Sequence, residues 1–215
     1  MHWLQSRIGR HLLPLLLGVL LLSAWEISVR ILNVPSYVLP PPSGILKALG
    51  LHGPLLAQHS VVTLQEVLLG FLFGATTGML VGMAMGLSDT CYRTLNPYVI
   101  ASIVFPKEAL APLFALWLGF GLVPKVVISA LIAFFPVATG TMRGIRSTPP
   151  ELDDLFDSLR ATWWQRLSKL KLPAALPAIM TALRTALPLA VIGAIVGEFV
   201  ASSKGIGHLI PDLLT

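Results

Sequence analysis

The chain has 215 residues, of which 55% are hydrophobic and 12% are charged. A soluble domain carries about 25% charged residues, so this composition excludes an ordinary soluble protein and indicates an integral membrane protein. The net charge of +5 does not indicate nucleic-acid binding, because most of the excess lies in loops expected to be cytoplasmic, where basic residues concentrate. The single cysteine, Cys91, excludes an internal disulfide and a cysteine-based metal cluster.

Apolar segments long enough to cross a bilayer follow one another along the chain, since a transmembrane helix needs about 20 mainly apolar residues. Lipid offers no hydrogen-bond partners to the backbone, so helices are the expected form of every span. The expected fold class is all-α: a polytopic membrane protein with about five transmembrane helices. The expected spans are residues 12–32, 60–87, 96–119, 123–142 and 174–200, with prolines and charges interrupting the third.

The first span has two interpretations, because Arg7 and Arg10 precede its apolar core as they would in a secretory signal peptide. The segment is long for a signal core, lacks a clear small-x-small cleavage site and is followed by further spans. We therefore expect a retained span. We also expect residues 1–58 to form an N-terminal part and residues 59–215 the main transmembrane domain.

The connection to the second span begins with a run of prolines, residues 40–42, which should break any helix. Ser43 follows and is expected to cap a short amphipathic helix. Apolar residues at 45, 46, 49 and 51 would lay this helix along the outer membrane interface.

The second span carries a glycine at every fourth position, which makes one face of the helix smooth. Another helix can then approach closely and pack through van der Waals contact. Tight packing and a moving interface both fit this pattern. The stripe consists of Gly70, Gly74, Gly78, Gly82 and Gly86.

Counting the spans orients the chain in the membrane. With the basic N-terminus inside, residues 88–97 and the long polar segment 143–173 are expected to be cytoplasmic, and residues 119–125 external. The basic content of 143–173 independently supports this side. No sixth span follows, so we expect an external C-terminus at Thr215, either because the chain is truncated or because it is a five-span variant.

The polar segment 143–173 contains two helix-start patterns of the S/T-x-x-E/Q type. Thr148 with Glu151 predicts a helix over about 149–159. Thr162 with Gln165 predicts a second helix over about 163–171, ending before Pro173.

The first of these helices carries an apolar stripe at helical spacing, which must be covered in a cytoplasmic loop. The pattern alone leaves two alternatives equally open. The stripe packs on the ends of the spans, or it enters a groove on a partner protein. Its residues are Leu152, Leu155, Phe156 and Leu159.

This loop resembles the EAA motif, E-A-A-x₃-G-x₉-I-x-L-P, of the permease subunits of type I ABC importers. With Leu172 and Pro173 on the final LP, residues 154–156 occupy the EAA positions and Arg160 the glycine. The spacing is kept although these letters differ. The nitrate, sulfonate, taurine and pyrimidine-precursor branch is also matched at WEISVR (25–30), VPSYVLPPPS (34–43), PKEALAPLFALWLGFG (106–121), AFFPV (133–137), LPAALPAIMTALRTAL (172–187), GEF (197–199) and GIGHLI (205–210).

The resemblance implies that the first loop helix is a coupling helix, which docks into a groove of a separate ATP-binding cassette ATPase dimer. The family glycine permits a left-handed backbone, so Arg160 must bear this conformation or the turn must differ. Implied partners also include a second permease subunit, identical or homologous, a solute-binding protein and the bilayer of the bacterial inner membrane. The implied coupling residues are Glu151, Leu152, Asp154, Leu155, Phe156, Leu159 and Arg160.

Charges inside the spans are costly and usually paired or functional. Lys107 and Glu108 lie in the broken third span, where irregular backbone is tolerated beside a cavity, so they are candidates for the translocation path. Pairing of Lys107 with a carboxylate on a neighbouring span is the structural alternative. Glu198 is a candidate for the outer gate, whereas Arg184 and Glu26 are assigned to helix packing.

No catalytic group, cofactor site or metal cluster is visible in the sequence, so ATP chemistry is assigned to another chain. The expected function is the permease subunit of a bacterial ABC importer for a small sulfonate, nitrate, taurine or pyrimidine-type solute. An ATP-independent secondary transporter or channel, a truncated permease that couples poorly and a membrane-embedded enzyme are the alternatives. Inverted hydropathy repeats, expected of many secondary transporters, are not evident.

Overall fold

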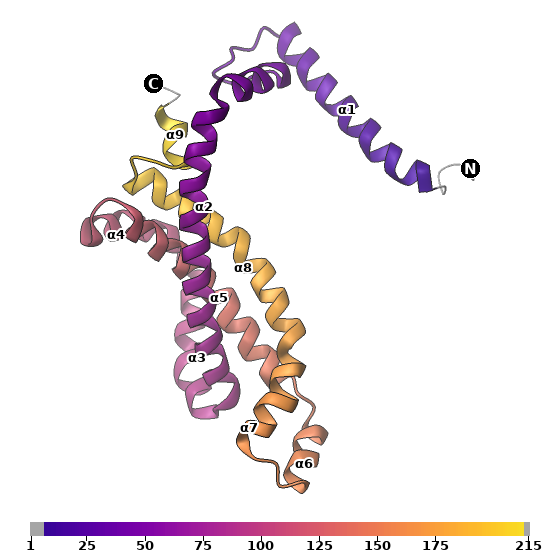
Figure 1. Ribbon diagram of the computed structural model, residues 1–215, viewed down its shortest axis with the longest axis vertical. Helices are drawn as coiled ribbons and strands as arrows, with labels where there is room; N and C mark the ends of the chain where they lie inside the picture. The colour runs from indigo at the N-terminus through magenta and orange to yellow at the C-terminus, as the bar shows by residue number, and fades with distance from the viewer. Residues whose placement is uncertain (1–6, 213–215) are drawn as a thin grey trace. The chain divides into compact units, whose positions relative to one another are not determined.

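The computed structural model describes residues 7–212, and the side chains of residues 12–102 and 104–209. The orientation was predicted from the basic side chains of Arg7 and Arg10, which lie outside this description. The C-terminus at Thr215, expected to be external, also lies outside it. The described elements are α1 (Arg7–Ile31), α2 (Pro42–Leu87), α3 (Asp89–Val104), η2 (Lys107–Leu110), α4 (Ala111–Leu118), α5 (Leu122–Arg146), α6 (Pro150–Ser158), α7 (Trp163–Arg166), η3 (Leu167–Lys171), α8 (Leu172–Ala201) and α9 (Ile206–Asp212) (Figure 1).

The chain divides after residue 57 into two compact units. This division lies one residue before the boundary that the sequence analysis expected. In the first unit, the carboxylate of Glu26 in α1 accepts the backbone N–H of Ser43 at 3.0 Å and its hydroxyl at 2.8 Å. Arg30 donates to the same carboxylate at 2.6 Å. Glu26 therefore caps the N-terminus of α2.

The prediction that Ser43 itself caps a short separate helix was wrong. Ser43 is the second residue of α2, which continues without interruption for 46 residues to Leu87. The proline run ends at Pro42, whose fixed φ suits the first helical position. Pro54 is accommodated inside the helix.

The described residues contain four helices long and apolar enough to span a membrane, or five if a bent pair counts as one span. This confirms the predicted all-α membrane fold. The four are Leu12–Ile31, Pro42–Leu87, Leu122–Arg146 and Trp163–Ala201.

The predicted third span is the bent pair, in which the helix of residues 89–102 and the helix of residues 107–118 meet at 84°. One end is fixed by Asp89, which pairs with Arg146 at the end of α5 at 2.7 Å. The other end is fixed by Gly121, whose N–H donates to the carbonyl of Ala201 at the end of α8 at 3.2 Å. The pair therefore carries the chain from one end of the second unit to the other, as a span would.

The second unit is built on the close packing of α2, α5 and α8, which lie alongside one another in Figure 1. The five glycines of α2 face α5 in parallel register, from Gly70 beside Ser129 to Gly86 beside Ile145. On its other side α5 runs antiparallel to α8, with Gly140 against Ala182 and Gly193 against Ser129. Small residues on three helices thus allow two backbone-to-backbone approaches.

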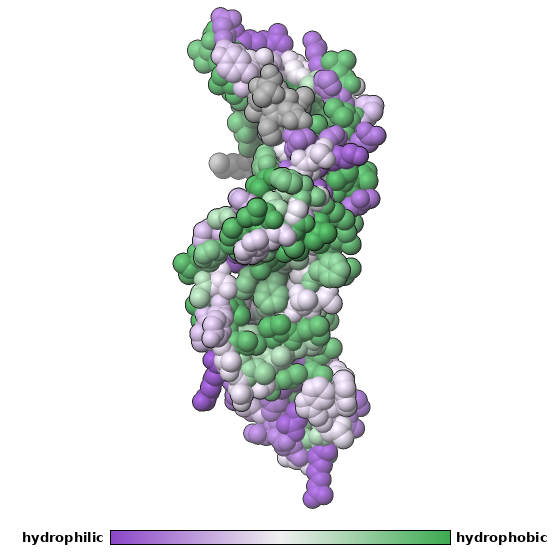
Figure 2. Space-filling model, turned by 90° about the vertical axis from the view of Figure 1, so that its left-hand side faces the viewer, coloured by the Kyte–Doolittle hydropathy of each residue, from purple (hydrophilic) through white to green (hydrophobic). Residues whose placement is uncertain are grey.

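Figure 2 shows hydrophobic residues over the middle of the second unit and hydrophilic residues at its lower end, where Figure 1 places α6 and α7. Large apolar side chains exposed in the second unit include Leu72, Phe73, Leu116 and Trp117. Such a band is what a bilayer covers, and it leaves the polar loop outside the hydrocarbon.

Gly78 provides a direct test of this packing. A Cβ at this position would lie 2.7 Å from the carbonyl oxygen of Phe134, a backbone atom that cannot move freely. We expect Gly78→Ala to cost about 1–3 kcal/mol and to lower the midpoint of thermal unfolding, measured by tryptophan fluorescence of the purified protein in detergent.

Gly50 is the matched control, since it lies on the same helix and a Cβ there would meet nothing within 4 Å. Gly50→Ala should leave the midpoint unchanged or raise it, because alanine is the better helix former by about 1 kcal/mol. Equal midpoints for the two variants would contradict the close approach of α2 and α5.

Candidate functional site

The polar loop between α5 and α8 folds as predicted into a short helix, a tight turn and a second helix start. The first helix, α6 (Pro150–Ser158), begins one residue later than expected. Its N-cap is Pro149, and no side chain caps it. The predicted capping box of Thr148 and Glu151 was wrong, because the Thr148 hydroxyl donates to the carbonyl of Ile145 at 3.0 Å instead.

The turn after α6 contains the backbone feature that the sequence left open. Arg160 has a φ of 48°, so this residue bears the left-handed conformation. Two hydrogen bonds close the turn, from the N–H of Ala161 to the carbonyl of Phe156 at 3.0 Å and from the N–H of Leu159 to the carbonyl of Leu155 at 3.0 Å.

The second capping box was predicted correctly. Thr162 accepts the N–H of Gln165 at 3.4 Å, and the Gln165 side chain accepts the N–H of Thr162 at 2.8 Å. The expected end of this helix before Pro173 was wrong, however. The π-helical turn η3 (Leu167–Lys171) joins α7 to α8, so one continuous helix runs over Trp163–Ala201. Pro173 fits because it occupies the first turn of α8.

Two ion pairs tie α6 to this continuous helix. Lys171 lies 2.5 Å from Asp153, and Arg166 pairs with Asp157. The guanidinium of Arg166 holds the pKa of the Asp157 carboxyl below its ordinary value, chiefly through their hydrogen bond. The orientation of α6 is therefore coupled to that of α8.

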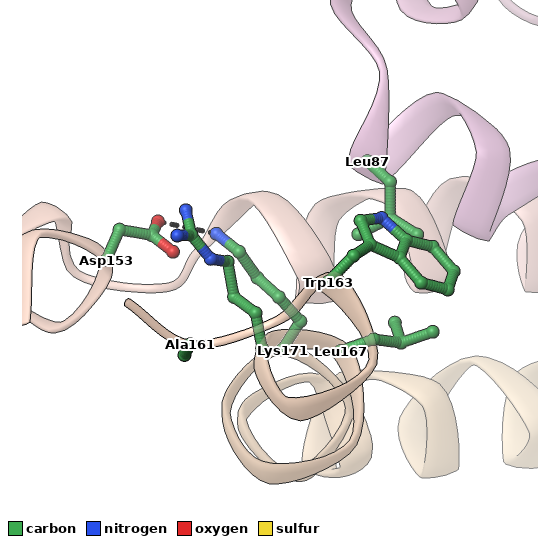
Figure 3. A pocket seen from close by; sticks show the side chains of 8 residues that line it. Leu87, Asp153, Ala161, Trp163, Leu167 and Lys171 are labelled. Atoms are coloured by element: carbon green, nitrogen blue, oxygen red, sulfur yellow. Dashed lines mark hydrogen bonds and ion pairs between the residues drawn. The ribbon is translucent and has the colours of Figure 1, made fainter. Parts of the chain in front are cut away.

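A pocket of about 510 Å³ lies between this loop and the end of α2. In Figure 3 the Lys171 side chain reaches across to Asp153, while Trp163 and Leu167 lie on the side of Leu87. The pocket lies between α6 and the end of α2 at Leu87. The side of α6 that faces away from the pocket is therefore not covered by α2.

The apolar stripe of α6 is exposed in the chain. Leu152, Leu155 and Leu159 are 40%, 49% and 68% exposed, and Phe156 is half-buried. The sequence left two ways to cover the stripe, packing on the ends of the spans or binding in a groove of a partner. In this structure the stripe does not pack on the ends of the spans. Trp163 and Trp164 add further exposed aromatic surface next to it.

A buried ion pair that the sequence analysis missed joins α2 to α5. Glu66 and Lys125 are 0% and 3% exposed, and their side chains form an ion pair. Lys125 also donates to the hydroxyl of Ser202 at 2.9 Å. The spacing of the glycines could have revealed this pair. Gly70 contacts Ser129, and Glu66 and Lys125 each lie four residues, about one helical turn, before these two positions.

Glu198 lies in the same region and is 1% exposed. Its carboxylate accepts the hydroxyl of Thr63 at 2.6 Å and the N–H of Gly207 at 2.6 Å. Gly205 packs directly against it and has a φ of 125°, which only glycine adopts readily. Glu198 thus fastens the segment before α9 to α8 and α2.

The other candidate charges are more accessible. The ammonium of Lys107 lies 4.7 Å from the ring centre of Phe135, and none of the ion pairs among the described residues includes it. Glu108 is exposed. Arg184, which we assigned to helix packing, is exposed as well.

Comparison with known proteins identifies the chain. The family model described as "Binding-protein-dependent transport system inner membrane component" matches residues 74–215. The chain belongs to this family.

Relatives of this permease are similar over most of their length. A probable ABC transporter permease protein of Haemophilus influenzae is 39% identical over 94% of this chain and 82% of its own. A putative aliphatic sulfonates transport permease protein of Bacillus subtilis is 37% identical, covering 92% and 72%. A formylaminopyrimidine transport permease protein of Halalkalibacterium halodurans is 36% identical, covering 98% and 84%. The resemblance inferred from the sequence is confirmed.

The chain is accordingly a permease subunit of an ABC importer and a multi-pass membrane transport component. The family match includes α5 to α9 and most of the glycine stripe of α2. The exposed stripe of α6, the Arg160 turn and the Glu198 contacts therefore all belong to the permease domain itself.

The turn at Arg160 can be tested by relieving its strain. A left-handed conformation costs a non-glycine residue roughly 1–2 kcal/mol, so Arg160→Gly should stabilise the turn by about 1 kcal/mol after glycine's extra chain entropy. Hydrogen exchange of the amides of residues 159–163 in the purified permease should slow. Arg160→Ala keeps the strain and serves as the control, and faster exchange in Arg160→Gly than in Arg160→Ala would contradict the assignment.

The buried ion pair is tested by removing its partners singly and together. Lys125→Met leaves the Glu66 carboxylate buried without its cation, which should cost about 3–5 kcal/mol. Adding Glu66→Met should restore most of the lost thermal stability, measured by unfolding in detergent. A double variant no more stable than Lys125→Met alone would show that the two charges do not act as a pair.

Proposed function

We propose that this permease couples solute movement to ATP hydrolysis on a separate ATP-binding cassette subunit, which α6 contacts. The observation that carries the proposal is the apolar stripe of α6, exposed at the hydrophilic end of the second unit. Exposed leucines at successive helical turns are a helix-in-groove binding pattern. The proposed contacts are Glu151, Leu152, Asp154, Leu155, Phe156, Leu159 and Arg160.

The attachment of α6 supports a mechanical role. Its ion pairs through Asp153 and Asp157 go to Lys171 and Arg166, which stand on the helix that continues into the membrane. A displacement of α6 by closure of an ATPase dimer would therefore be transmitted to α8. A loosely hinged loop would absorb the same displacement.

We further propose that two copies of this permease, or one copy and a homologue, form the pathway in a bacterial inner membrane. A solute-binding protein would deliver the solute on the outer side. The path would pass the break between α3 and α4, where Lys107 and Glu108 remain accessible and irregular backbone is tolerated beside water. Glu198 would fix the outer ends of α2 and α8 next to this path rather than line it.

The solute is proposed from the relatives and from the match to their branch. Two of the three relatives named above carry a solute in their names, a putative permease for aliphatic sulfonates and a permease for formylaminopyrimidine. We propose a small organic solute of the sulfonate, nitrate, taurine or pyrimidine-precursor type. Transport would follow alternating access, in which the solute binds the outward and inward states with different affinities.

Leu155→Lys tests the coupling contact. A charge on the docking stripe should weaken binding of the ATPase subunit and abolish the solute-dependent increase in ATP hydrolysis. Loss of a central apolar contact costs about 2 kcal/mol or more, which is about thirtyfold in affinity. The measurement is co-purification of the ATPase subunit, followed by ATPase activity of the reconstituted complex.

Ser168→Lys is the matched control, because it places the same charge on an exposed position of the same loop, on η3 rather than on the proposed docking surface of α6. It should co-purify and hydrolyse ATP like the parent. Solute uptake by vesicles that contain the permease alone would refute the proposal and favour a secondary transporter or channel.

A further inference from the structure

Arg184 lies deep within α8, in the apolar span Trp163–Ala201. It follows Leu172 by 12 positions and precedes Ala201 by 17 within α8, so at 1.5 Å per residue it is about 18 Å from one end and about 26 Å from the other. Its side chain is exposed. The α5-facing residues nearby, Ala182 and Ala186, are buried and lie on another side of the helix.

Arg184 has polar and apolar exposed neighbours on α8, because Met180 and Leu187 lie one turn before and after it. Thr181 and Thr185 lie one turn before and directly after Arg184, and both are exposed. They also line a groove of about 490 Å³ between α8 and α5, together with Thr139 and Arg143 of α5. Gly144 packs beside Ala178, so Arg143 is about 8 Å nearer the α6 end than Arg184.

The adjoining side of α8 is apolar, with exposed Leu176, Met180, Leu187 and Val191. The helix therefore presents a lipid-type surface and, beside it, a surface with two threonines, and Arg184 lies at the border between them. This division is expected of a helix that meets lipid on one side and water or solute on the other.

Neither Arg184 nor Arg143 belongs to an ion pair within the described part of the chain, where the other membrane-embedded cation, Lys125, is paired with Glu66. A guanidinium at the centre of a span costs at least about 2.5–3.5 kcal/mol on insertion scales. Its side chain reaches roughly 7 Å, less than the half-thickness of about 15 Å that separates the bilayer centre from the head groups. Lipid phosphate therefore cannot neutralise it.

We propose that Arg184, with Thr181 and Thr185, forms an anion-binding subsite for the sulfonate, carboxylate or phosphate group of the transported solute. Arg184 supplies the positive charge and a fork of N–H donors. The hydroxyls of Thr181 and Thr185 donate to the carbonyls of Pro177 and Thr181 at 2.9 and 3.0 Å, and they would donate to the anion by rotating out of these bonds. Arg143 provides a second positive charge for the anion, nearer the α6 end of the groove. The inference rests on the proposed function, because it places this face of α8 on the translocation path.

The test measures the electrostatic potential at the subsite without requiring the solute. Thr185→Cys is made in a Cys91→Ser background, and the complete transporter is assayed in native membranes. The probes are two thiol reagents of similar size, anionic 2-sulfonatoethyl and cationic 2-trimethylammonioethyl methanethiosulfonate. The ratio of their reaction rates, relative to a free thiol in solution, reports the local charge.

We expect the anionic reagent to be favoured at Thr185→Cys. Adding Arg184→Gln should lower the rate ratio, because a unit charge about 6 Å away changes the local concentration of each ion by about threefold in water and by about a hundredfold at an effective dielectric constant of 20. Arg184→Lys should keep the preference. Arg93→Gln, which removes an exposed cation near the start of α3, should leave the ratio unchanged.

Leu176→Cys, about two turns from Arg184 on the apolar side of the same helix, should react slowly with both reagents. The proposal is overturned if Leu176→Cys reacts as fast as Thr185→Cys, if Thr185→Cys is inert in the assembled complex, or if Arg184→Gln leaves the ratio unchanged. Co-purification of the ATPase subunit is scored on the same preparations. Intact coupling with an unchanged ratio would refute the subsite alone, whereas failed ATPase binding by the parent protein would refute the proposed function.

Discussion

The structure depends on how closely three helix backbones approach one another. Glycines on α2 admit the carbonyls and small side chains of α5, and glycines on α5 and α8 bring those two helices together. In a membrane this closeness must provide the association energy through packing, because lipid removes the hydrophobic drive between helices. The register that the glycines impose also places Glu66 beside Lys125, so even the buried ion pair follows from the packing of small residues.

The continuous helix over Trp163–Ala201 connects the packed part of the second unit to α6. Its 39 residues extend about 58 Å at 1.5 Å per residue, well beyond the bilayer core of about 30 Å. One end is tied to α6 by two ion pairs, and the other is fastened to α2 and the segment before α9 through Glu198. The same helix carries Arg184 between them, so movement of either end must change the surroundings of this cation.

Local sequence signals predicted the helices well where backbone chemistry decides the outcome. The spans and the Thr162 capping box were predicted, because each depends on a few neighbouring residues. The conformation of Arg160 was left open, and only the structure shows that this residue is left-handed. The Thr148 box failed because that hydroxyl finds a carbonyl one turn back in α5. The break expected before Pro173 failed because a π-helical turn absorbs it. Glu66, Lys125 and the exposure of Arg184 depend on which helix faces which, and that information lies in tertiary packing.

The charges of the membrane-embedded part divide into two groups by their partners. Glu66, Lys125 and Glu198 are buried and bound to groups of the same chain, so each has a partner whether or not a solute is present. Arg184 has an equally costly position in the span without such a partner among the described residues. A charge that is satisfied internally stabilises one conformation, whereas a charge satisfied only from outside changes the free energy of a state when its ligand arrives. An alternating-access transporter needs the second kind on its path, because only a ligand that binds two states differently shifts their populations. Arg184 meets that requirement, and the buried trio does not.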